Sequence, residues 1–322
     1  QDKPADPDMP WQQYAFERMT ESNPFPSVMG RVCPAPCQSG CNRNEVDDFV
    51  GINAVEHYVG DWAIENKVTY PKASADTGKK VAVIGGGPAG LSAAYHLRKL
   101  GHRVTVFDEH EELGGMMRYG IPGYRTPREM LDSEINRIVD MGVEVKPSTR
   151  IGTDISMEKI DADFDAVFWG IGAQSGRALP VAGADASNCI TGVAFLDAYN
   201  QGRLQHVTGR VIVIGGGDTS IDVASVARRL GNIITENVND RPENIVMGHT
   251  AHDVATTAVR EGADVTLTSL FKFDDMMASA REREDAVSEG VDIMDGVMPL
   301  EVMLDDDGRA RALKMTKCHM DG

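Results

Sequence analysis

Apolar and polar positions follow the same order of runs at two places in the chain. Residues 79–110 read KKVAVIGGGPAGLSAAYHLRKLGHRVTVFDEH: an apolar run, a glycine-rich turn, an amphipathic stretch and a second apolar run. Short apolar runs bounded by glycine predict strands, and apolar residues at helical spacing predict a helix. At 210 the pattern restarts as RVIVIGGGDTSIDVASVARRLG. The chain therefore contains two predicted β-turn-α units, and the first is closed by its own second strand.

The second unit needs a closing strand too. ADVTLTSL at 263–270 is the best candidate, because it is a short apolar run rich in β-branched residues. About twenty residues, NIITENVNDRPENIVMGHT at 232–250, are inserted before it. Such a long connection is unusual within one unit.

The remaining patterns divide the chain into three expected domains. The Pro-rich segment 1–77 carries helical patterns at about 10–20 and 51–65, and it ends in the linker ASADTGKK. Residues 78–205 and 206–322 would each form a Rossmann-like domain. The predicted fold class is therefore α/β, with two dinucleotide-binding domains behind a small helical segment.

One helix start in the first Rossmann-like domain has a capping signature. Thr126 is the expected N-cap, Pro127 fits the first turn, and Glu129 can reach back to the cap. Apolar residues at helical spacing follow. The runs VEVK and DAVFWGIGA after this helix predict two more strands.

The first glycine turn has the spacing of a dinucleotide phosphate site, with glycines in G-x-G-x-x-G register directly after the strand. The first glycine permits the tight turn, the second lets the backbone approach a pyrophosphate, and the third allows close helix–strand packing. Asp108 closes the second strand, where a carboxylate can accept both ribose hydroxyls. The residues expected at the phosphate are Gly85, Gly87, Pro88, Ala89 and Gly90.

The second glycine turn departs from this register at its third position, where Ser220 stands in place of glycine. Serine is small enough for near-normal packing, so a second dinucleotide site is still expected. The residues expected there are Gly215, Gly217, Asp218, Thr219 and Ser220. The following strand ends at 269–272 without an arginine pair for a 2′-phosphate, which favours NAD(H) over NADP(H). The acid expected for NAD(H) is missing there too.

Two such sites suggest two dinucleotides, flavin in one domain and nicotinamide in the other. A hydride that passes directly between them needs orientation and electrostatics rather than a general base, so no catalytic side chain is predicted. The insertion at 232–250 can be a plain loop, a cover over the nicotinamide site or a docking segment for a partner.

The amino-acid composition narrows the binding partners and the cellular compartment that can be expected for this protein. The 32 basic and 49 acidic residues give a net charge of −17, which argues against a nucleic-acid or anionic-membrane surface. Charges interrupt every apolar run before membrane-spanning length, and no signal peptide is recognised. An odd total of five cysteines does not fit a secreted disulfide framework. A cytoplasmic protein is therefore expected.

Three of the five cysteines lie close together in RVCPAPCQSGC. Cys33, Cys37 and Cys41 would share a helix face, but Pro34 and Pro36 disfavour a helix, so a loop with convergent thiols is expected. A structural zinc site usually matches one cysteine pair with another, and a redox-active disulfide prefers two thiols. Three thiolates with one ligand from elsewhere suit a 4Fe-4S cluster. Zinc and plain structural thiols remain as alternatives.

Five stretches, in this order, resemble the glutamate synthase small-subunit family. They are GRVCPAPCQSGC, VGINAVEHYVGDWA, VAVIGGGPAGLSAAYHLRKLGHRVTVFDE, LGGMMRYGIPGYRTPREMLDSEINRI and VIVIGGGDTSIDVA. That family includes the N-terminal half of dihydropyrimidine dehydrogenase and several NAD(P)H:acceptor electron-transfer subunits. The likeness runs from about residue 15 to 317. It implies FAD at the first glycine turn, NAD(P)H at the second and a 4Fe-4S cluster in the N-terminal segment.

The resemblance also implies further site residues. Glu56 falls where the family supplies the fourth ligand to such a cluster, together with the three cysteines. The neighbouring His57 is more simply an ordinary surface histidine. The residues that fall near the flavin of the family are Gly114, Gly115, Arg118, Gly170 and Gly172.

Three departures from the family stand out. The family carries further cysteines upstream for a second cluster, and it returns after its NAD domain to complete the FAD domain. This chain begins with Gln1 and stops at KCHMDG without either part, so a fragment or a shortened relative is expected. NADPH-using members place two arginines where Leu270 and Phe271 stand, which supports NADH.

The expected function is that of an iron–sulfur flavoprotein moving electrons between NADH and a protein partner through FAD and one or more 4Fe-4S clusters. The missing arginines and the insertion resemble the NADH-linked flavoprotein that works with dissimilatory sulfite reductase in sulfur metabolism. A glutamate synthase small subunit, with its large subunit as partner, is the next candidate. Two other classes of protein are alternatives. A flavin-dependent disulfide reductase would need a cysteine pair at the flavin, which this sequence does not suggest, and a non-catalytic assembly module would keep the dinucleotide fold for structure alone. The sequence leaves the oligomeric state open.

Overall fold

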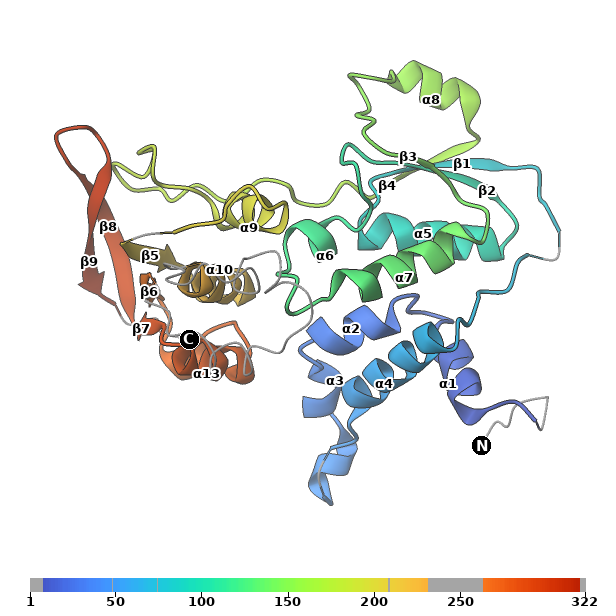
Figure 1. The fold of residues 1–322 in the computed structure, drawn as a ribbon, viewed down its shortest axis with the longest axis horizontal. Helices are drawn as coiled ribbons and strands as arrows, with labels where there is room; N and C mark the ends of the chain where they lie inside the picture. The colour runs from blue at the N-terminus through green and yellow to red at the C-terminus, as the bar shows by residue number, and fades with distance from the viewer. Residues whose placement is uncertain (1–7, 48, 74, 208, 231–262, 319–322) are drawn as a thin grey trace, which may run out of the picture. The chain divides into compact units, whose positions relative to one another are not determined.

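The computed structural model divides into two compact units (Figure 1). Unit 1 comprises Gln1–Arg118 and Arg125–Gly172, and unit 2 comprises Tyr119–Tyr124 and Ala173–Gly322. The residues that the structure describes are 8–47, 49–73, 75–207, 209–230 and 263–318. The insertion predicted at 232–250 lies outside the described residues.

Unit 1 contains a parallel sheet of strand order β3-β2-β1-β4, with helices on both faces (Figure 1). This is the order of one half of a Rossmann fold, as the apolar runs predict. The strands are β1 (Lys80–Ile84), β2 (Arg103–Phe107), β3 (Glu144–Lys146) and β4 (Ala166–Trp169). The helices that accompany them are α5 (Pro88–Lys99), α6 (Met116–Tyr119), α7 (Arg128–Val139) and α8 (Met157–Asp163).

Strand β1 shows why this sheet forms, because its side chains alternate between two apolar layers. Ala82 and Ile84 belong to one cluster with Ile160 of α8. Val83 belongs to another cluster with Tyr95 of α5. A strand covered on both faces must be apolar at nearly every position, which is the pattern VAVI.

The N-terminal helices share the core of unit 1. Phe16, Val28 and Val59 belong to the same buried cluster as Leu131 and Ile135 of α7. The helices are α1 (Trp11–Met19), α2 (Pro26–Val32), α3 (Pro36–Ser39), η1 (Asn42–Glu45) and α4 (Ile52–Glu65). The helices expected at about 10–20 and 51–65 are therefore present. The domain limits at 77 and 205 stay a prediction. The N-terminal helices share one core with α7, and this packing does not show where one cofactor-binding domain ends and the next begins.

The start of α7 differs from the predicted capping box. The helix begins at Arg128, and its N-cap is Pro127, which has extended geometry and no side-chain acceptor. Thr126 lies one residue too early, and its fully buried hydroxyl has no hydrogen-bond partner among the described residues. The prediction that Thr126 caps this helix is wrong, because Pro127 takes the extended conformation that a cap requires.

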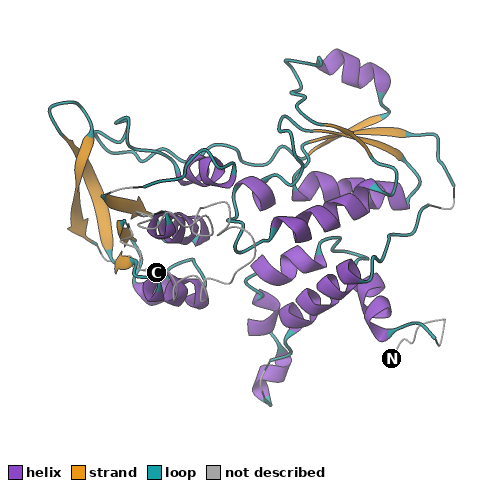
Figure 2. Ribbon diagram, viewed as in Figure 1, coloured by secondary structure: helices purple, strands orange, loops and turns teal. Residues whose placement is uncertain are grey.

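Unit 2 contains a parallel sheet of order β5-β6-β7 and an antiparallel hairpin, β8-β9 (Figure 2). The strands are β5 (Arg210–Ile214), β6 (Asp264–Thr268), β7 (Asp292–Met294), β8 (Val297–Leu304) and β9 (Ala310–Lys317). The helices are α9 (Gly192–Asn200), α10 (Asp218–Arg229), η3 (Phe273–Asp275) and α13 (Ala280–Ser288). Because β6 pairs with β5 in parallel, the prediction that ADVTLTSL closes the second unit is confirmed.

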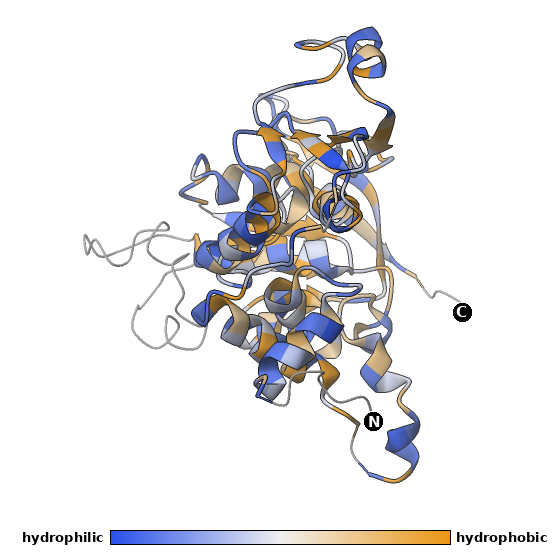
Figure 3. Cartoon of the chain, turned by 90° about the vertical axis from the view of Figure 1, so that its right-hand side faces the viewer, coloured by the Kyte–Doolittle hydropathy of each residue, from blue (hydrophilic) through white to orange (hydrophobic). Residues whose placement is uncertain are grey.

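The core of unit 2 lies between its parallel sheet and the helices α9, α10 and α13. Val213, Leu267, Val226 and Ala286 come from four different elements and belong to one buried cluster. Helical ribbons carry both orange and blue residues in Figure 3, as expected for amphipathic helices with one buried face.

Candidate functional site

The first glycine turn brings together three of the predicted flavin-site residues. Gly85 has a φ of 104°, and a Cβ there would lie 2.4 Å from the Gly170 carbonyl oxygen. A Cβ on Gly90 would lie 1.8 Å from the Gly85 carbonyl oxygen. The backbone of β1, the start of α5 and the end of β4 therefore meet at distances that only glycine permits.

The start of α5 is open toward a ligand. Gly87 is its N-cap, Pro88 occupies the first turn, and both Pro88 and Ala89 are exposed. The first N–H groups of an α-helix have no intrahelical partner, so this end attracts phosphate. The loop at 114–115 lies alongside, since Gly114 N donates to the Gly86 carbonyl at 2.8 Å. A Cβ on Gly115 would approach Gly87 Cα to 2.7 Å.

Asp108 is directed at this turn from the end of β2. Its Oδ2 accepts a hydrogen bond from Gly86 N at 2.6 Å, and its Oδ1 accepts one from His110 N at 2.8 Å. Oδ1 also lies 3.0 Å from His110 Nδ1, and Oδ2 has a second lone pair that a ligand hydroxyl could approach. The side chain is thus fixed beside the glycine turn, where the proposed ribose contact requires it.

Arg118 is engaged within the protein. Its buried guanidinium donates from Nε to the Leu113 carbonyl at 2.6 Å and pairs with Asp132. Arg128 in turn donates to the carbonyl oxygens of Met117 and Arg118 at 3.1 and 2.7 Å. These contacts brace the loop that follows β2. Sequence reasoning missed Arg128 and Asp132, although their spacing of four places them on one face of α7.

The second glycine turn accommodates Ser220 at the position where the first turn has a glycine. Gly215 has a φ of 145°, and a Cβ on it would lie 2.2 Å from Ser220 Oγ. The missing side chain at Gly215 therefore makes room for Ser220. Gly217 is the N-cap of α10, and Asp218 and Thr219 are exposed in its first turn.

The cysteine loop combines two short helices with a sharp bend. Cys33 follows the last residue of α2, Cys37 lies in α3, and Ala35 between them has a left-handed φ of 52°. Cys37 is exposed, while Cys33 and Cys41 are half-buried. The backbone N–H groups of Val50 and then Arg43 hold the pKa of the Cys41 thiol below its ordinary value. A lowered pKa favours the thiolate that a metal requires.

The predicted cluster ligands lie in neighbouring segments, but they are not gathered. In the part of the chain that the structure describes, no group of three or more His, Cys, Asp or Glu side chains could hold a metal ion. Glu56 on α4 accepts a hydrogen bond from Asn23 Nδ2 at 2.6 Å. Gln38 of the cysteine loop accepts one from Asn53 N at 2.9 Å, which ties the loop to α4. Three cysteine thiols have the donor chemistry of a 4Fe-4S cluster, which they would hold. Glu56 as the fourth ligand stays a prediction from the family resemblance.

Glu134 of α7 fastens helix α2, which leads into the cysteine loop, to the first Rossmann-like fold. It lies on α7, is fully buried, and accepts hydrogen bonds from Ser27 N at 2.8 Å and Val28 N at 3.0 Å. These two residues form the first turn of α2, whose other end leads to Cys33. Burial raises the pKa of Glu134 to about 7, against the two N–H donors, which favour the carboxylate.

We expect this carboxyl group to make stability depend on pH. Its pKa rises from 4.5 to about 7 on folding. The folded state therefore holds the proton more tightly, and the free energy of unfolding falls as the pH rises from about 4.5 to about 7. The loss is on the order of 3 kcal/mol, since one pKa unit corresponds to about 1.4 kcal/mol.

Urea unfolding at several pH values, followed in wild type and in Glu134→Gln, measures this effect. The variant should lose most of the slope in that pH range, whereas Glu284→Gln, at an exposed position of α13, should keep it. An equal slope in wild type and Glu134→Gln would show that the pH dependence has another source.

Two family profiles match the segments of the chain that contain the two glycine turns and the three clustered cysteines. The sequence profile of the pyridine nucleotide-disulphide oxidoreductases matches residues 79–318. The chain belongs to this family. A second profile, dihydropyrimidine dehydrogenase domain II with its 4Fe-4S cluster, matches residues 11–68. The chain therefore combines a pyridine-nucleotide oxidoreductase fold with an N-terminal iron–sulfur domain.

Curated relatives confirm the resemblance to glutamate synthase small subunits. The glutamate synthase (NADPH) small chain of Mycobacterium tuberculosis is 37% identical over 233 residues, covering 68% of this chain and 48% of its own. That of Escherichia coli is 30% identical over 321 residues, covering 95% and 61%. The NAD-dependent dihydropyrimidine dehydrogenase subunit PreT of Salmonella typhimurium is 37% identical, covering 67% and 53%. The chain spans about half the length of the curated relatives it matches.

Solved structures agree on the fold. FprA from Mycobacterium tuberculosis in complex with NADPH has a TM-score of 0.54 and 17% identity, covering 74% of this chain and 67% of its own. This likeness shows the fold alone. None of the described helices is both long and apolar enough to cross a membrane.

Proposed function

We propose that this chain is the electron-input portion of an iron–sulfur flavoprotein, an NADH:acceptor oxidoreductase that passes electrons to a partner protein. When bound, FAD would supply hydride acceptance from reduced nicotinamide, and the 4Fe-4S cluster would supply one-electron transfer onward. The observation that carries the proposal is the packing of the cysteine segment on the first dinucleotide fold, through Glu134 and a shared core.

The chain's own residues would bind and orient these groups. The start of α5 and the loop at 114–115 would hold the flavin pyrophosphate, with Asp108 at the ribose. The start of α10 would hold the pyrophosphate of the nicotinamide dinucleotide. Cys33, Cys37, Cys41 and Glu56 would ligate the cluster. No side chain is assigned to proton transfer, because hydride transfer between stacked rings needs alignment only.

NADH is the proposed reductant. The loop after β6 carries Leu270 and Phe271, and neither can clamp a 2′-phosphate. The proposed partner is a dissimilatory sulfite reductase, which rests on the resemblance to the NADH-linked flavoprotein of sulfur metabolism. The relatives named glutamate synthase small chains favour a second candidate, delivery of electrons to a glutamate synthase large subunit.

An anaerobic titration of the full-length native protein with NADH, followed by visible absorption, tests the reductant and the electron path. We expect the flavin band to bleach and the broad iron–sulfur band to decline with it. NADPH should act only at much higher concentration. Flavin bleaching over a colourless background would overturn the cluster, and reduction by NADPH alone would overturn the assignment of NADH.

The two partners are separated by a second experiment on the same protein. After reduction with NADH, the protein is mixed with a dissimilatory sulfite reductase or with a glutamate synthase large subunit, and reoxidation of its flavin is timed. Fast reoxidation by the first alone supports the proposed partner, and by the second alone supports the second candidate.

A further inference from the structure

The end of strand β6 lies directly against the second glycine turn. A Cβ on Gly216 would lie 2.6 Å from Ser269 Oγ, and Ser269 is only 2% exposed. In a doubly wound fold, the residues after this strand face the adenosine ribose, which carries a 2′-hydroxyl in NADH and a 2′-phosphate in NADPH. The stretch 269–272 is therefore where this unit would distinguish the two.

The turn between β7 and β8 is bound to the same stretch by three backbone hydrogen bonds. Ser269 N donates to the Met294 carbonyl at 3.0 Å, and Val297 N donates to the Ser269 carbonyl at 2.9 Å. Gly296 N donates to the Phe271 carbonyl at 3.2 Å. Because Asp295 stands between Met294 and Gly296, its backbone is fixed beside the end of β6.

The side chain of Asp295 forms an ion pair with Lys272, the only cation among residues 269–272. Its Oδ1 lies 3.2 Å from Lys272 Nζ, and its Oδ2 accepts a hydrogen bond from Phe273 N at 2.9 Å. That N–H is the largest influence holding the pKa of Asp295 below its ordinary value, and Lys272 adds to it. The carboxylate is therefore charged at neutral pH and held from two sides.

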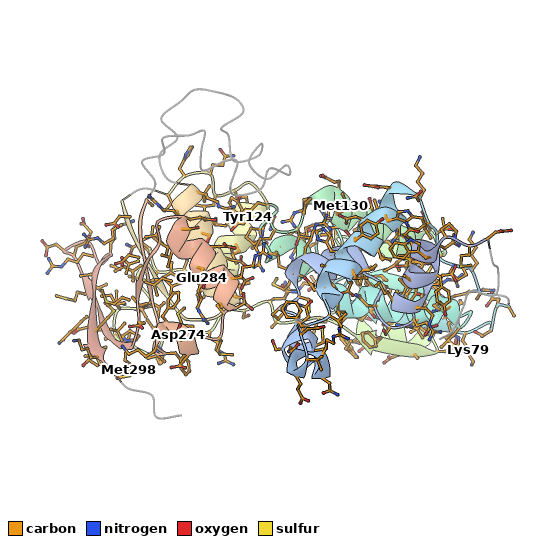
Figure 4. The ribbon with its side chains drawn as sticks, turned by 90° about the horizontal axis from the view of Figure 1, so that it is seen from below. Lys79, Tyr124, Met130, Asp274, Glu284 and Met298 are labelled. Carbon is orange, nitrogen blue, oxygen red and sulfur yellow. The ribbon has the colours of Figure 1, made fainter. Side chains whose placement is uncertain are left out.

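The rim, meaning the charged residues around the 269–272 stretch, also includes Lys317, which pairs with Val297 across the β8–β9 hairpin. Asp274, labelled in Figure 4, and Asp275 are exposed in η3. Arg283 of α13 is buried, and its guanidinium donates to the carbonyl oxygens of Met276 and Ala278. Because Arg283 is buried, the rim presents three aspartates and two lysines to a ligand, and a phosphate dianion would meet repulsion there.

We infer that Asp295 is a specificity residue that discriminates against the 2′-phosphate of NADPH. It neutralises Lys272, which would otherwise attract the phosphate, and adds a fixed negative charge to the rim. The inference rests on the proposed function, and it supplies from β7 the acid that the end of β6 lacks. Asp295 acts on the approaching nucleotide through electrostatic repulsion, and it takes no part in hydride transfer.

The test compares dissociation constants for NADH and NADPH by anaerobic calorimetry in the full-length native protein, reduced beforehand with dithionite so that neither nucleotide can transfer a hydride. Asp295→Asn keeps an acceptor for Phe273 N but removes the charge. We expect NADPH to bind about tenfold more tightly, with NADH nearly unchanged. Lys272→Gln should weaken NADPH binding by a similar factor. Both effects should shrink at high ionic strength, because the rim is partly exposed.

Asp264→Asn is the matched control, because it removes the same charge at the start of β6, where Asp264 pairs with Arg210. It should leave the ratio of the two constants unchanged. An unchanged ratio in Asp295→Asn, or tighter NADPH binding in Lys272→Gln, would overturn the inference. A wild type that binds NADH without reduction of its flavin would overturn the proposed function, and the ratio of constants would still decide the role of Asp295.

Discussion

Replacing Gly90 with alanine is expected to weaken the retention of FAD by about ten- to a hundredfold. A Cβ at this position would lie 1.8 Å from the Gly85 carbonyl oxygen, 3.0 Å from its carbonyl carbon and 3.0 Å from Val83 Cγ1. The first two atoms belong to the backbone of the glycine turn, so α5 must move away from β1. Overpacking of this kind costs about 1–3 kcal/mol or more, and here it displaces the phosphate-binding end of the helix.

FAD content per polypeptide after gel filtration measures this effect. We expect affinity for FAD to fall by about ten- to a hundredfold, since each 1.4 kcal/mol is a factor of ten. Circular dichroism separates loss of the cofactor from loss of the fold. Gly217→Ala is the matched control, because a Cβ on Gly217, the N-cap of the corresponding helix α10, meets no atom within 4 Å.

The control should keep the FAD content of wild type, although it alters the second turn. If Gly90→Ala also keeps that content, the first glycine turn does not hold the flavin. The geometry of Gly85 and Gly90 would then serve helix–strand packing alone.

The parallel strands could be predicted from sequence because each is a short apolar run beside a glycine turn. Burial on both faces accounts for the run in β1, whereas Ile212 and Ile214 of β5 are exposed. VAVI at 81–84 and VIVI at 211–214 each stand between a polar residue and a glycine turn, and the structure places both in strands. The role of the glycines could also be predicted, since the close contact between Gly90 and Gly85 joins residues only five positions apart in the sequence. Local chemistry of this kind leaves a mark in the sequence.

Features that depend on distant contacts left no such mark. Arg118 fell in a predicted flavin loop, but its partner Asp132 comes from the next helix. Residues 269–272 contain no acid, and the carboxylate that pairs with Lys272, Asp295, comes from the turn after β7. Thr126 has the residue type of a cap, yet the conformation of Pro127 determines where α7 begins. Sequence spacing predicts neighbours along the chain better than neighbours across a fold.

Replacing Cys37 with serine is expected to uncouple the two halves of the electron path. Serine keeps the size of the side chain, and Cys37 is exposed in α3, so the fold should persist. The variant should lose iron and acid-labile sulfide, because an alcohol is a poor substitute for a thiolate ligand. NADH should still bleach the flavin, since the glycine turns and Asp108 are untouched. Electron delivery to the partner protein should fall on the order of a hundredfold or more.

Metal analysis, electron paramagnetic resonance after NADH reduction, and the rate of partner reduction together measure this outcome. Cys189→Ser is the control, because Cys189 is a half-buried thiol of unit 2 with no assigned ligand role. Wild-type iron and sulfide in Cys37→Ser would remove Cys37 from the ligand set. Zinc in place of iron in the wild type would make the loop structural, and the protein would be an NADH:flavin reductase. Loss of flavin reduction together with iron would mean that the cysteine segment supports the flavin fold itself, through the contact of α2 with Glu134.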